Sequence, residues 1–264
     1  MFLILLNDIA ITDPCILFPL GREARPFFQG FRPQQRFPGA PCRARFSGPE
    51  WLTVLVLETG VGLERTQRAL EWVLSKPLLG NLPYEPKVVV SAGFAGALHD
   101  EFQIGDLLLA TDVVDPAGKS WPVPWPKSLP EGKWQPPLRR GRLLTTSQFI
   151  SEPAQKRSLG QSHQALAVDM ESATVASICS RKQVPFGCLR AISDPVDAPV
   201  SREVMTLLEG ANISWLRLGI LLAHSPSKAG ELWRLGKATR MAARQLAKGL
   251  GELLTLTLPW GTDL

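Results

Sequence analysis

The sequence contains one tyrosine, three histidines and no long apolar run. The histidines, His99, His163 and His224, lack the spacing of metal ligands, so we expect no metal site. The most apolar stretch, residues 215–223, includes Arg217 and is too short to span a bilayer. These absences disfavour a metal-centred enzyme and a polytopic membrane protein.

Paired cysteines and a clear signal peptide are also absent. No two of the four cysteines form a C-x-x-C pair, and Cys179 and Cys188 lie in apolar runs, which indicates reduced core thiols. The apolar N-terminus has no basic region and is interrupted early by Asp8, unlike a signal peptide. We therefore expect a cytoplasmic protein, and we leave peripheral contact with a membrane open.

Three common nucleotide-binding and hydrolase motifs are missing. The sequence has no G-x-x-x-x-G-K-[ST], no G-x-G-x-x-G and no G-x-S-x-G, the signatures of P-loop, Rossmann and α/β-hydrolase sites. A net charge of +5 suggests an anionic partner, but basic and aromatic residues do not interleave as they do on nucleic-acid platforms. We expect no organic cofactor and no nucleic-acid partner.

What is present is the composition of a globular protein, with 45% hydrophobic and 20% charged residues in 264 positions. Apolar segments of strand length alternate with segments of helical periodicity, which favours one α/β domain (1–264) with a parallel or mixed sheet. The expected strands are 15–20, 51–57, 87–91, 105–111, 141–146, 165–168 and 186–192. The expected helices are 63–74, 171–181, 203–224 and 228–255, with irregular segments at 25–49 and 116–137.

Carboxylates follow several of these strands. Asp169 and Glu171 follow the strand at 165–168, Asp194 follows the strand at 186–192, and Glu23 follows the first strand. Open α/β sheets place their active sites at strand ends, so the acids suit acid–base chemistry there. Each has an alternative structural explanation: a helix cap for Asp169 or Glu171, a turn for Asp194, and a solvated charge for Glu23.

Four segments together resemble the nucleoside phosphorylase superfamily, and its methylthioadenosine/S-adenosylhomocysteine nucleosidases most closely. The segments are VVVSAGFAGAL, TTSQFI, AVDMESATVASIC and PFGCLRAISD, in the order in which the family has them. The pair V-D-M-E-S-A and R-A-I-S-D is the most specific. The resemblance implies a three-layer α/β/α sandwich around a mixed central sheet, N-glycosidic cleavage by water, and a homodimer.

The resemblance also implies roles for individual residues. Asp194 would protonate N7 of the leaving purine, and Glu23 would activate the attacking water. Glu171 would bind the ribose hydroxyls and Met170 would pack against the sugar. The glycine segments 60–62 and 93–96 would form turns that let the backbone approach the ribose. The other implied substrate-binding residues are Phe149, which would stack on the base, Ile150, Ser193, Gly60, Gly62, Gly93, Phe94 and Ala95.

These roles match what the reaction requires. Cleavage of the bond leaves positive charge on the sugar and negative charge on the base, so a protonated carboxyl near the base needs a raised pKa. Carboxylates near the sugar stabilise the positive charge, and another takes a proton from water.

The sequence departs from the family pattern at several positions. Phe94 replaces a small polar residue, Asp169 replaces a glutamate, and Ser147 replaces an aspartate that contacts adenine. The arginine that binds phosphate in many phosphorylases has no counterpart, because valines occupy residues 88–90. Arg65 is large enough to take the place of this arginine, but the sequence does not establish that it does so. The loss of this arginine favours water over phosphate.

Two further regions bear on the substrate. The loop at 116–137 carries Trp121, Trp125 and Trp134, which either pack on the core or form an apolar lid over a 5′ substituent. The segment at 228–255 is amphipathic, with a basic face that is either solvated or bound to anionic lipid. That basic face contains Arg234, Lys237, Arg244 and Lys248.

The basic face, the K-x-x-L at Lys156 to Leu159 and the VDMES wording resemble the hopanoid-associated nucleosidases. These are thought to release adenine from an adenosyl-lipid, which would account for both an apolar lid and a basic face. Two alternatives stay open. One is a phosphate-dependent purine nucleoside phosphorylase, and the other is a catalytically silent protein that binds nucleosides or a lipid surface on the same scaffold.

Overall fold

The computed structural model describes residues 14–48, 53–79, 82–125, 134, 137–198 and 228–256. The strands in these ranges are β1 (Cys15–Phe18), β2 (Pro33–Arg36), β3 (Arg43–Ser47), β4 (Val54–Glu58), β5 (Leu78–Leu79), β6 (Leu82–Pro83), β7 (Val89–Ala97), β8 (Leu107–Val114), β9 (Ser120–Pro122), β10 (Leu138–Thr145), β11 (Ala167–Asp169) and β12 (Phe186–Asp194). The helices are α1 (Gly21–Gly30), α2 (Leu63–Leu74), α3 (Pro153–His163), α4 (Ser172–Lys182) and α7 (Lys228–Leu256).

The centre of the molecule is one mixed sheet with the order β11-β10-β8-β12-β7-β1-β4-β3-β2. Strand β1 is parallel to β4 and β7, and β7 is parallel to β12, whereas β8 is antiparallel to β12. Strand β11 pairs with β10 and also, antiparallel, with the far end of β7. Because of this second pairing the sheet curls at that end, and the ends of β7, β11 and β12 come together.

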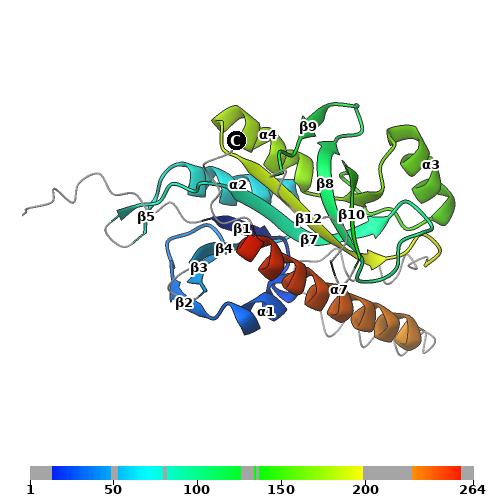
Figure 1. Cartoon of the computed structure of the whole chain (residues 1–264), viewed down its shortest axis with the longest axis horizontal. Helices are drawn as coiled ribbons and strands as arrows, with labels where there is room; N and C mark the ends of the chain where they lie inside the picture. The colour runs from blue at the N-terminus through cyan, green and yellow to red at the C-terminus, as the bar shows by residue number, and fades with distance from the viewer. Residues whose placement is uncertain are drawn as a thin grey trace, which may run out of the picture.

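Helices cover both faces of the sheet (Figure 1). On one face, α1 and α7 pack on the sheet through a core cluster that includes Phe27, Leu246 and Leu250. On the other face, α2 and α4 pack through a second cluster that includes Leu70 and Val175. The predicted three-layer α/β/α sandwich around a mixed sheet is confirmed.

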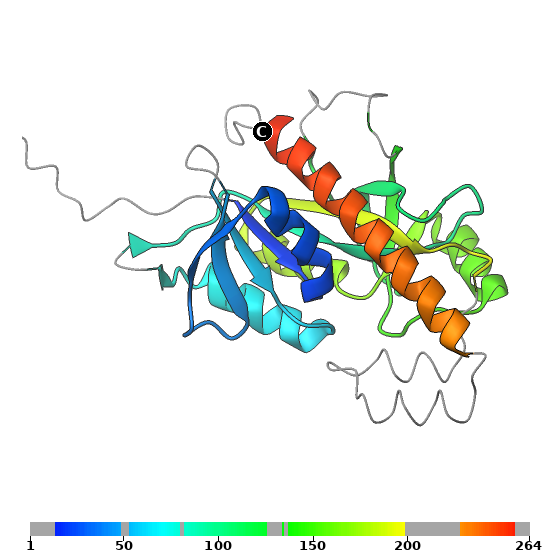
Figure 2. The same ribbon diagram turned by 90° about the horizontal axis from the view of Figure 1, so that it is seen from below.

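The long helix α7 crosses its face of the sheet diagonally, as Figure 2 shows. It packs on the sheet through an apolar stripe, in which Ala242, Leu246 and Leu253 are at most 1% exposed. The predicted helix at 228–255 is confirmed by α7, whereas the predicted helix at 203–224 lies outside the described residues. Within the described ranges, no helix has both the length and the apolar composition needed to cross a bilayer.

Several elements differ from the prediction. Strands β2 and β3 form within residues 25–49 and β9 forms within residues 116–137, segments that were expected to be irregular. Residues 21–30 form α1 although Pro26 lies inside it, and the polar segment 153–163 forms α3, which the sequence pattern did not reveal. The predicted strand at 87–91 does not stop at Gly93; β7 continues through Gly96 to Ala97. This continuation places the glycine segment inside the sheet rather than in a turn.

Candidate active site

The three predicted carboxylates gather around residues 93–96 of β7. Glu23 lies in the first turn of α1, directly after β1. Glu171 follows β11, whose residue Val168 pairs with Gly96. Asp194 ends β12 and also pairs with Gly96. The structure therefore places all three carboxylates at one edge of the sheet, not on separate faces.

Glu23 is buried, with 2% of its surface exposed. Its two carboxylate oxygens accept backbone hydrogen bonds from different elements: Oε2 from the Leu20 amide at 2.7 Å and Oε1 from the Phe94 amide at 3.0 Å. Burial raises the pKa of Glu23 to about 7, although both amides and the cation of Arg190 oppose the rise. Glu23 is thus not a solvated turn charge, and it is poised to exchange a proton near neutral pH.

Glu171 stands at the N-cap position of α4 but makes no capping hydrogen bond there. Its Oε1 instead accepts the Gly62 amide at 3.2 Å, from the loop before α2. Burial and the neighbouring charge of Asp169 raise the pKa of Glu171 to about 7. The side chain is therefore not used as a helix cap.

The capping role falls to Asp169, which also pairs with a buried arginine. Its carboxylate accepts the Ser172 amide, with the shorter contact at 3.1 Å, and Arg190 donates to Oδ2 through Nε at 2.9 Å and Nη2 at 2.6 Å. Arg190 also donates to the hydroxyls of Ser91 and Ser172. This buried network ties β7, β11, α4 and β12 together beneath the carboxylates.

Asp194 is buried, with 6% of its surface exposed. Its Oδ2 accepts a hydrogen bond from Lys156 Nζ at 2.8 Å, and its Oδ1 accepts one from the Ser193 hydroxyl at 2.9 Å. Burial raises the pKa of Asp194, and the nearby Lys156 ammonium opposes that rise. Asp194 therefore keeps its proton more readily than an exposed aspartate does, as a general acid requires.

A small cavity joins Asp194 to the residues predicted to hold the base. Its volume is about 30 Å³, and Gly96, Phe149, Ile150 and Met170 line it together with Asp194. Ile150 is buried, whereas Phe149 is 37% exposed at this position. The predicted base-binding residues and the predicted acid thus share one cavity.

The glycines and their neighbours fall into two groups. Gly60 and Gly62 have φ angles of 85° and 105°, so their loop needs glycine to turn and to present the Gly62 amide to Glu171. Gly93, Phe94 and Ala95 belong instead to β7, so the prediction that they form a turn is wrong. A Cβ at Gly93 would meet Glu23 Oε1 at 3.2 Å, which shows how closely the strand approaches the carboxylate.

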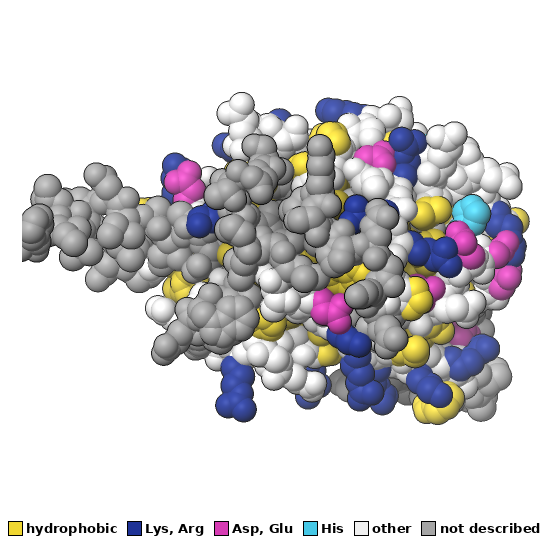
Figure 3. Space-filling view, in the orientation of Figure 1, with side chains coloured by type: hydrophobic (Ala, Val, Ile, Leu, Met, Phe, Trp, Pro, Cys, Tyr) yellow, Lys and Arg dark blue, Asp and Glu magenta, His cyan; other side chains and the backbone are white. Residues whose placement is uncertain are grey.

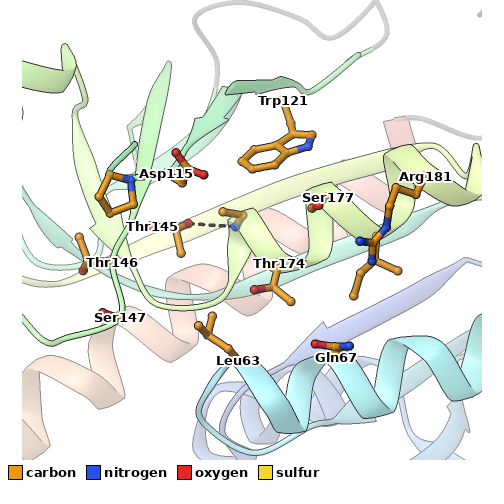
Figure 4. Close-up of a pocket in the computed structure, with 13 residues that line it drawn as sticks. Leu63, Gln67, Asp115, Trp121, Thr145, Thr146, Ser147, Thr174, Ser177 and Arg181 are labelled. Carbon is orange, nitrogen blue, oxygen red and sulfur yellow. Dashed lines mark hydrogen bonds between the residues drawn. The ribbon is translucent and has the colours of Figure 1, made fainter. Parts of the chain in front are cut away.

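A larger cavity of about 400 Å³ lies beside this site, between α2, α4 and the strand ends near β9 and β10 (Figure 4). Leu63 and Gln67 line it from α2, and Thr174, Ser177 and Arg181 line it from α4. Trp121, from β9, extends over it. Glu23, Glu171 and Asp194 do not line this cavity, although Thr146 borders both cavities.

All three tryptophans of the 116–137 segment pack against the core, the first of the two predicted roles, and the lid over a 5′ substituent stays a prediction. Trp125 packs against both core clusters and donates from Nε1 to the Ala110 carbonyl at 2.7 Å. Trp134 is partly buried against the α1–α7 side of the core, whereas Trp121 borders the larger cavity.

Sequence reasoning missed two basic side chains at the site. Arg190 was visible as a charged residue in an apolar strand, where an arginine is rarely buried without a partner. Lys156 entered only as part of the K-x-x-L wording, and its place at the site was missed because the polar helix that carries it was not predicted. Both are at most 1% exposed, and both contact carboxylates of the site.

Comparison with known proteins agrees with this fold. A curated 5′-methylthioadenosine/S-adenosylhomocysteine nucleosidase from Bacillus cereus (strain G9842) is 26% identical over 163 residues, which cover 53% of this chain and 68% of the relative. A nucleosidase of the same name from Helicobacter pylori, solved in complex with a substituted pyrrolidinol, superposes with a TM-score of 0.66 at 19% identity, covering 94% of this chain and 99% of that one.

Two further solved structures share the fold. Futalosine hydrolase of Helicobacter pylori has a TM-score of 0.66 at 18% identity, covering 93% of this chain and 98% of its own. The 5′-methylthioadenosine nucleosidase of Arabidopsis thaliana has a TM-score of 0.68 at 16% identity, covering 95% and 98%. Residues 46–214, more than half of the chain, match the family model described as Phosphorylase superfamily, and the protein belongs to that superfamily.

Proposed function

We propose that the protein hydrolyses the N-glycosidic bond of a purine nucleoside that carries an apolar 5′ substituent, with adenine as the expected base. The observation that carries the proposal is the grouping of Glu23, Glu171 and Asp194 around one segment of β7. The curated nucleosidase relatives support the same reaction.

In the proposed mechanism, Asp194 donates a proton to N7 while the bond to the sugar breaks. Glu23 accepts a proton from the attacking water, and its pKa of about 7 leaves a substantial fraction ionised at neutral pH. Glu171 binds the ribose hydroxyls and Met170 packs against the sugar. The negative charge of these carboxylates stabilises the positive sugar ring electrostatically.

The base is proposed to enter the small cavity beside Asp194. A cavity of about 30 Å³ has room for about one water molecule, so a purine must displace part of the lining. Phe149 is an exposed member of that lining and is proposed to move onto the face of the base. Ile150 would read the edge of the base through its backbone, and Ser193 would steady Asp194.

Water is preferred over phosphate as the nucleophile for two reasons. Val88, Val89 and Val90 are at most 1% exposed, so the strand before the glycine segment offers no cation to an anion. Arg190 is committed to Asp169, although Arg65, which lies against Gly60, remains a basic group near the loop. Strict dependence of turnover on phosphate would replace the hydrolase with a phosphorylase.

A nucleoside panel tests the proposal. Free base is measured with and without phosphate for methylthioadenosine, adenosine and a 5′-alkyl adenosine with a long chain. We expect release without phosphate, and a preference for the long chain would support the hopanoid-associated branch. If ligands bind but no base is released from any nucleoside, the protein is a silent binder.

The second proposed partner is an anionic membrane, which would bind a basic surface on α7. We define this basic surface as Arg234, Lys237, Arg240, Arg244 and Lys248. These side chains are exposed along α7, and Trp233 beside them is 65% exposed. Figure 3 shows Lys and Arg side chains along the lower edge of the molecule, where Figure 1 places α1 and α7. Co-sedimentation with anionic vesicles should be lost in high salt; binding that is absent, or that salt leaves unchanged, contradicts this contact.

Localisation and assembly complete the proposal. Four free thiols, three of them buried, fit a reducing cytoplasm. A homodimer is expected from the family, and a protomer mass of 29.0 kDa makes it simple to detect by analytical ultracentrifugation. A species of 29 kDa at micromolar concentration would contradict the dimer.

A further inference from the structure

The lysine behind the proposed acid is unusual in its burial. Lys156 is 0% exposed, and its ammonium donates to Asp194 Oδ2 at 2.8 Å and to the Pro195 carbonyl at 3.0 Å. A buried ammonium is unfavourable unless it is paired and hydrogen-bonded. The polar helix α3 therefore directs the side chain of Lys156 inward, where it contacts Asp194, the residue that the mechanism uses as an acid.

The packing of α3 explains how Lys156 reaches that position. Lys156 and Gly160 are four residues apart and are the two buried residues of this helix. A Cβ at Gly160 would lie 2.9 Å from the Leu98 carbonyl, so glycine lets the helix approach the end of β7 closely. The close approach brings Lys156 within hydrogen-bond distance of the end of β12.

The neighbouring residue, Arg157, provides a natural contrast. It binds Asp197 and Asp100 on the surface, with its Nη2 at 2.8 Å from Asp100 Oδ1. Two adjacent cations of α3 thus hold the same turn after β12, but Lys156 alone of the two contacts Asp194. Among the residues that the structure describes, Asp169 lines the same small cavity as Asp194, and Arg190 is paired with Asp169.

The two side chains share one transferable proton. With Lys156 as an ammonium and Asp194 as a carboxylate, the pair is neutral overall, and moving a proton from Nζ to Oδ2 gives an equally neutral amine and carboxylic acid. That transfer creates no buried net charge, so it avoids the large desolvation cost of an isolated buried ion. The carboxyl group then carries this one proton on Oδ2, while Oδ1 still accepts the hydrogen bond of the Ser193 hydroxyl.

We propose that Lys156 is the proton source behind Asp194, so that the two side chains work as one acid during base release. The inference rests on the proposed function. The Nζ–H bond breaks as an O–H bond forms on Asp194, and the proton of Asp194 passes to N7 as the electron pair of the glycosidic bond moves to the base. Lys156 is left as a neutral amine and Asp194 as a carboxylate, and solvent restores the ammonium. Lys156 is a positioning residue, since it acts through Asp194.

The test compares Lys156→Arg with Lys156→Met and with the matched surface control Arg157→Met. Arginine keeps the positive charge but does not give up its proton in proteins, so it separates charge from proton supply. We expect Lys156→Arg to release adenine from methylthioadenosine about 100-fold more slowly or worse, the size of a general-acid contribution. Arg157→Met should stay within about threefold of wild type, because its contacts are solvent-exposed.

Two readouts distinguish proton supply from a folding defect. A riboside with a 4-nitrophenolate leaving group needs no proton from the enzyme, so Lys156→Arg should cleave it within about tenfold of the wild-type rate, while a damaged fold loses both substrates equally. In Lys156→Met the buried Asp194 must hold the proton alone, and the alkaline limb of kcat/KM should move to lower pH. The proposal would be overturned if Lys156→Arg kept wild-type activity on methylthioadenosine or lost activity equally on both substrates. It would also be overturned if the alkaline limb of Lys156→Met stayed in place or moved to higher pH. Failure of wild type on every purine nucleoside would instead overturn the proposed function.

Discussion

Arg190 and Asp169 form a buried ion pair in which the two side chains are each 1% exposed, with Nη2 at 2.6 Å from Oδ2. The pair joins β12 to β11 below the point where Glu171 and Asp194 leave those strands. Because the pair is sealed from water, removal of one partner leaves the charge of the other without solvation. Asp169 stands where the family has the longer glutamate, and its side chain is held by Arg190 and by the backbone at the start of α4.

Removal of one partner of this pair should destabilise the fold strongly. Arg190→Met leaves the carboxylate of Asp169 buried without its cation, which should lower the free energy of unfolding by about 3–5 kcal/mol. The matched control is Lys76→Met, which breaks an exposed pair with Glu85 and should cost less than about 1 kcal/mol. Denaturant unfolding at pH 7 measures both, and equal losses would contradict the structural role of Arg190.

The raised pKa of Glu23 predicts a pH-dependent stability. The native state takes up a proton at about 7, whereas the unfolded chain does so near 4.5, so the native state binds more protons between these values. Stability from this group is therefore complete below about pH 4.5 and falls as pH rises towards 7. A shift of this size corresponds to about 3 kcal/mol.

Glu23→Gln removes this titration. We expect the slope of unfolding free energy against pH to become shallower between pH 4.5 and 7 in the variant, with Glu171 supplying the remainder. Turnover should fall by about 100-fold or more, because the glutamine cannot accept a proton from water. An unchanged slope would mean that Glu23 titrates normally.

The glycine segment predicts a local steric effect on the acid. A Cβ at Gly96 would lie 2.8 Å from Asp194 Oδ2, so Gly96→Ala must displace the carboxylate from Lys156. We expect base release to fall by about 100-fold, because small displacements of catalytic groups have effects of this order. Gly236→Ala is the control: it meets nothing within 4 Å in α7 and should stabilise the fold by up to about 1 kcal/mol. Full activity in Gly96→Ala would show that Asp194 needs no such position.

The sequence predicted the sheet better than the surface helices. Buried runs such as 54–57 and 186–192 identified β4 and β12, because a strand covered on both faces is apolar throughout. Helix α1 was missed because Pro26 and several arginines hid its pattern, and α3 was missed because its exposed face is polar and its buried face holds a lysine and a glycine.

The site was predictable only in part, for a related physical reason. Acids that follow strands share a sheet edge by topology, so Glu171 and Asp194 could be predicted together. The partners that set their pKa values come from elements far away in sequence: Gly62 lies 109 residues from Glu171, and Lys156 lies 38 residues from Asp194. Spacing along one chain carries no signal for such contacts.

Asp194→Asn separates chemistry from binding. Asparagine keeps the size of the side chain but has no acidic proton, so adenine release should fall by about 100-fold or more while affinity for the nucleoside changes little. Equilibrium binding of methylthioadenosine to the variant, measured calorimetrically, checks the second half. Loss of binding together with loss of turnover would indicate that Asp194 holds the site together instead of donating a proton.

Release of free base from methylthioadenosine and from a long-chain 5′-alkyl adenosine, by wild type in buffer without phosphate, tests the account most directly. We expect adenine to appear with the hydrolysed sugar at a rate that phosphate does not increase, and Glu23→Gln and Asp194→Asn to be slower by about 100-fold or more. Absence of free adenine with both nucleosides, or its appearance only when phosphate is added, would contradict hydrolysis at these carboxylates.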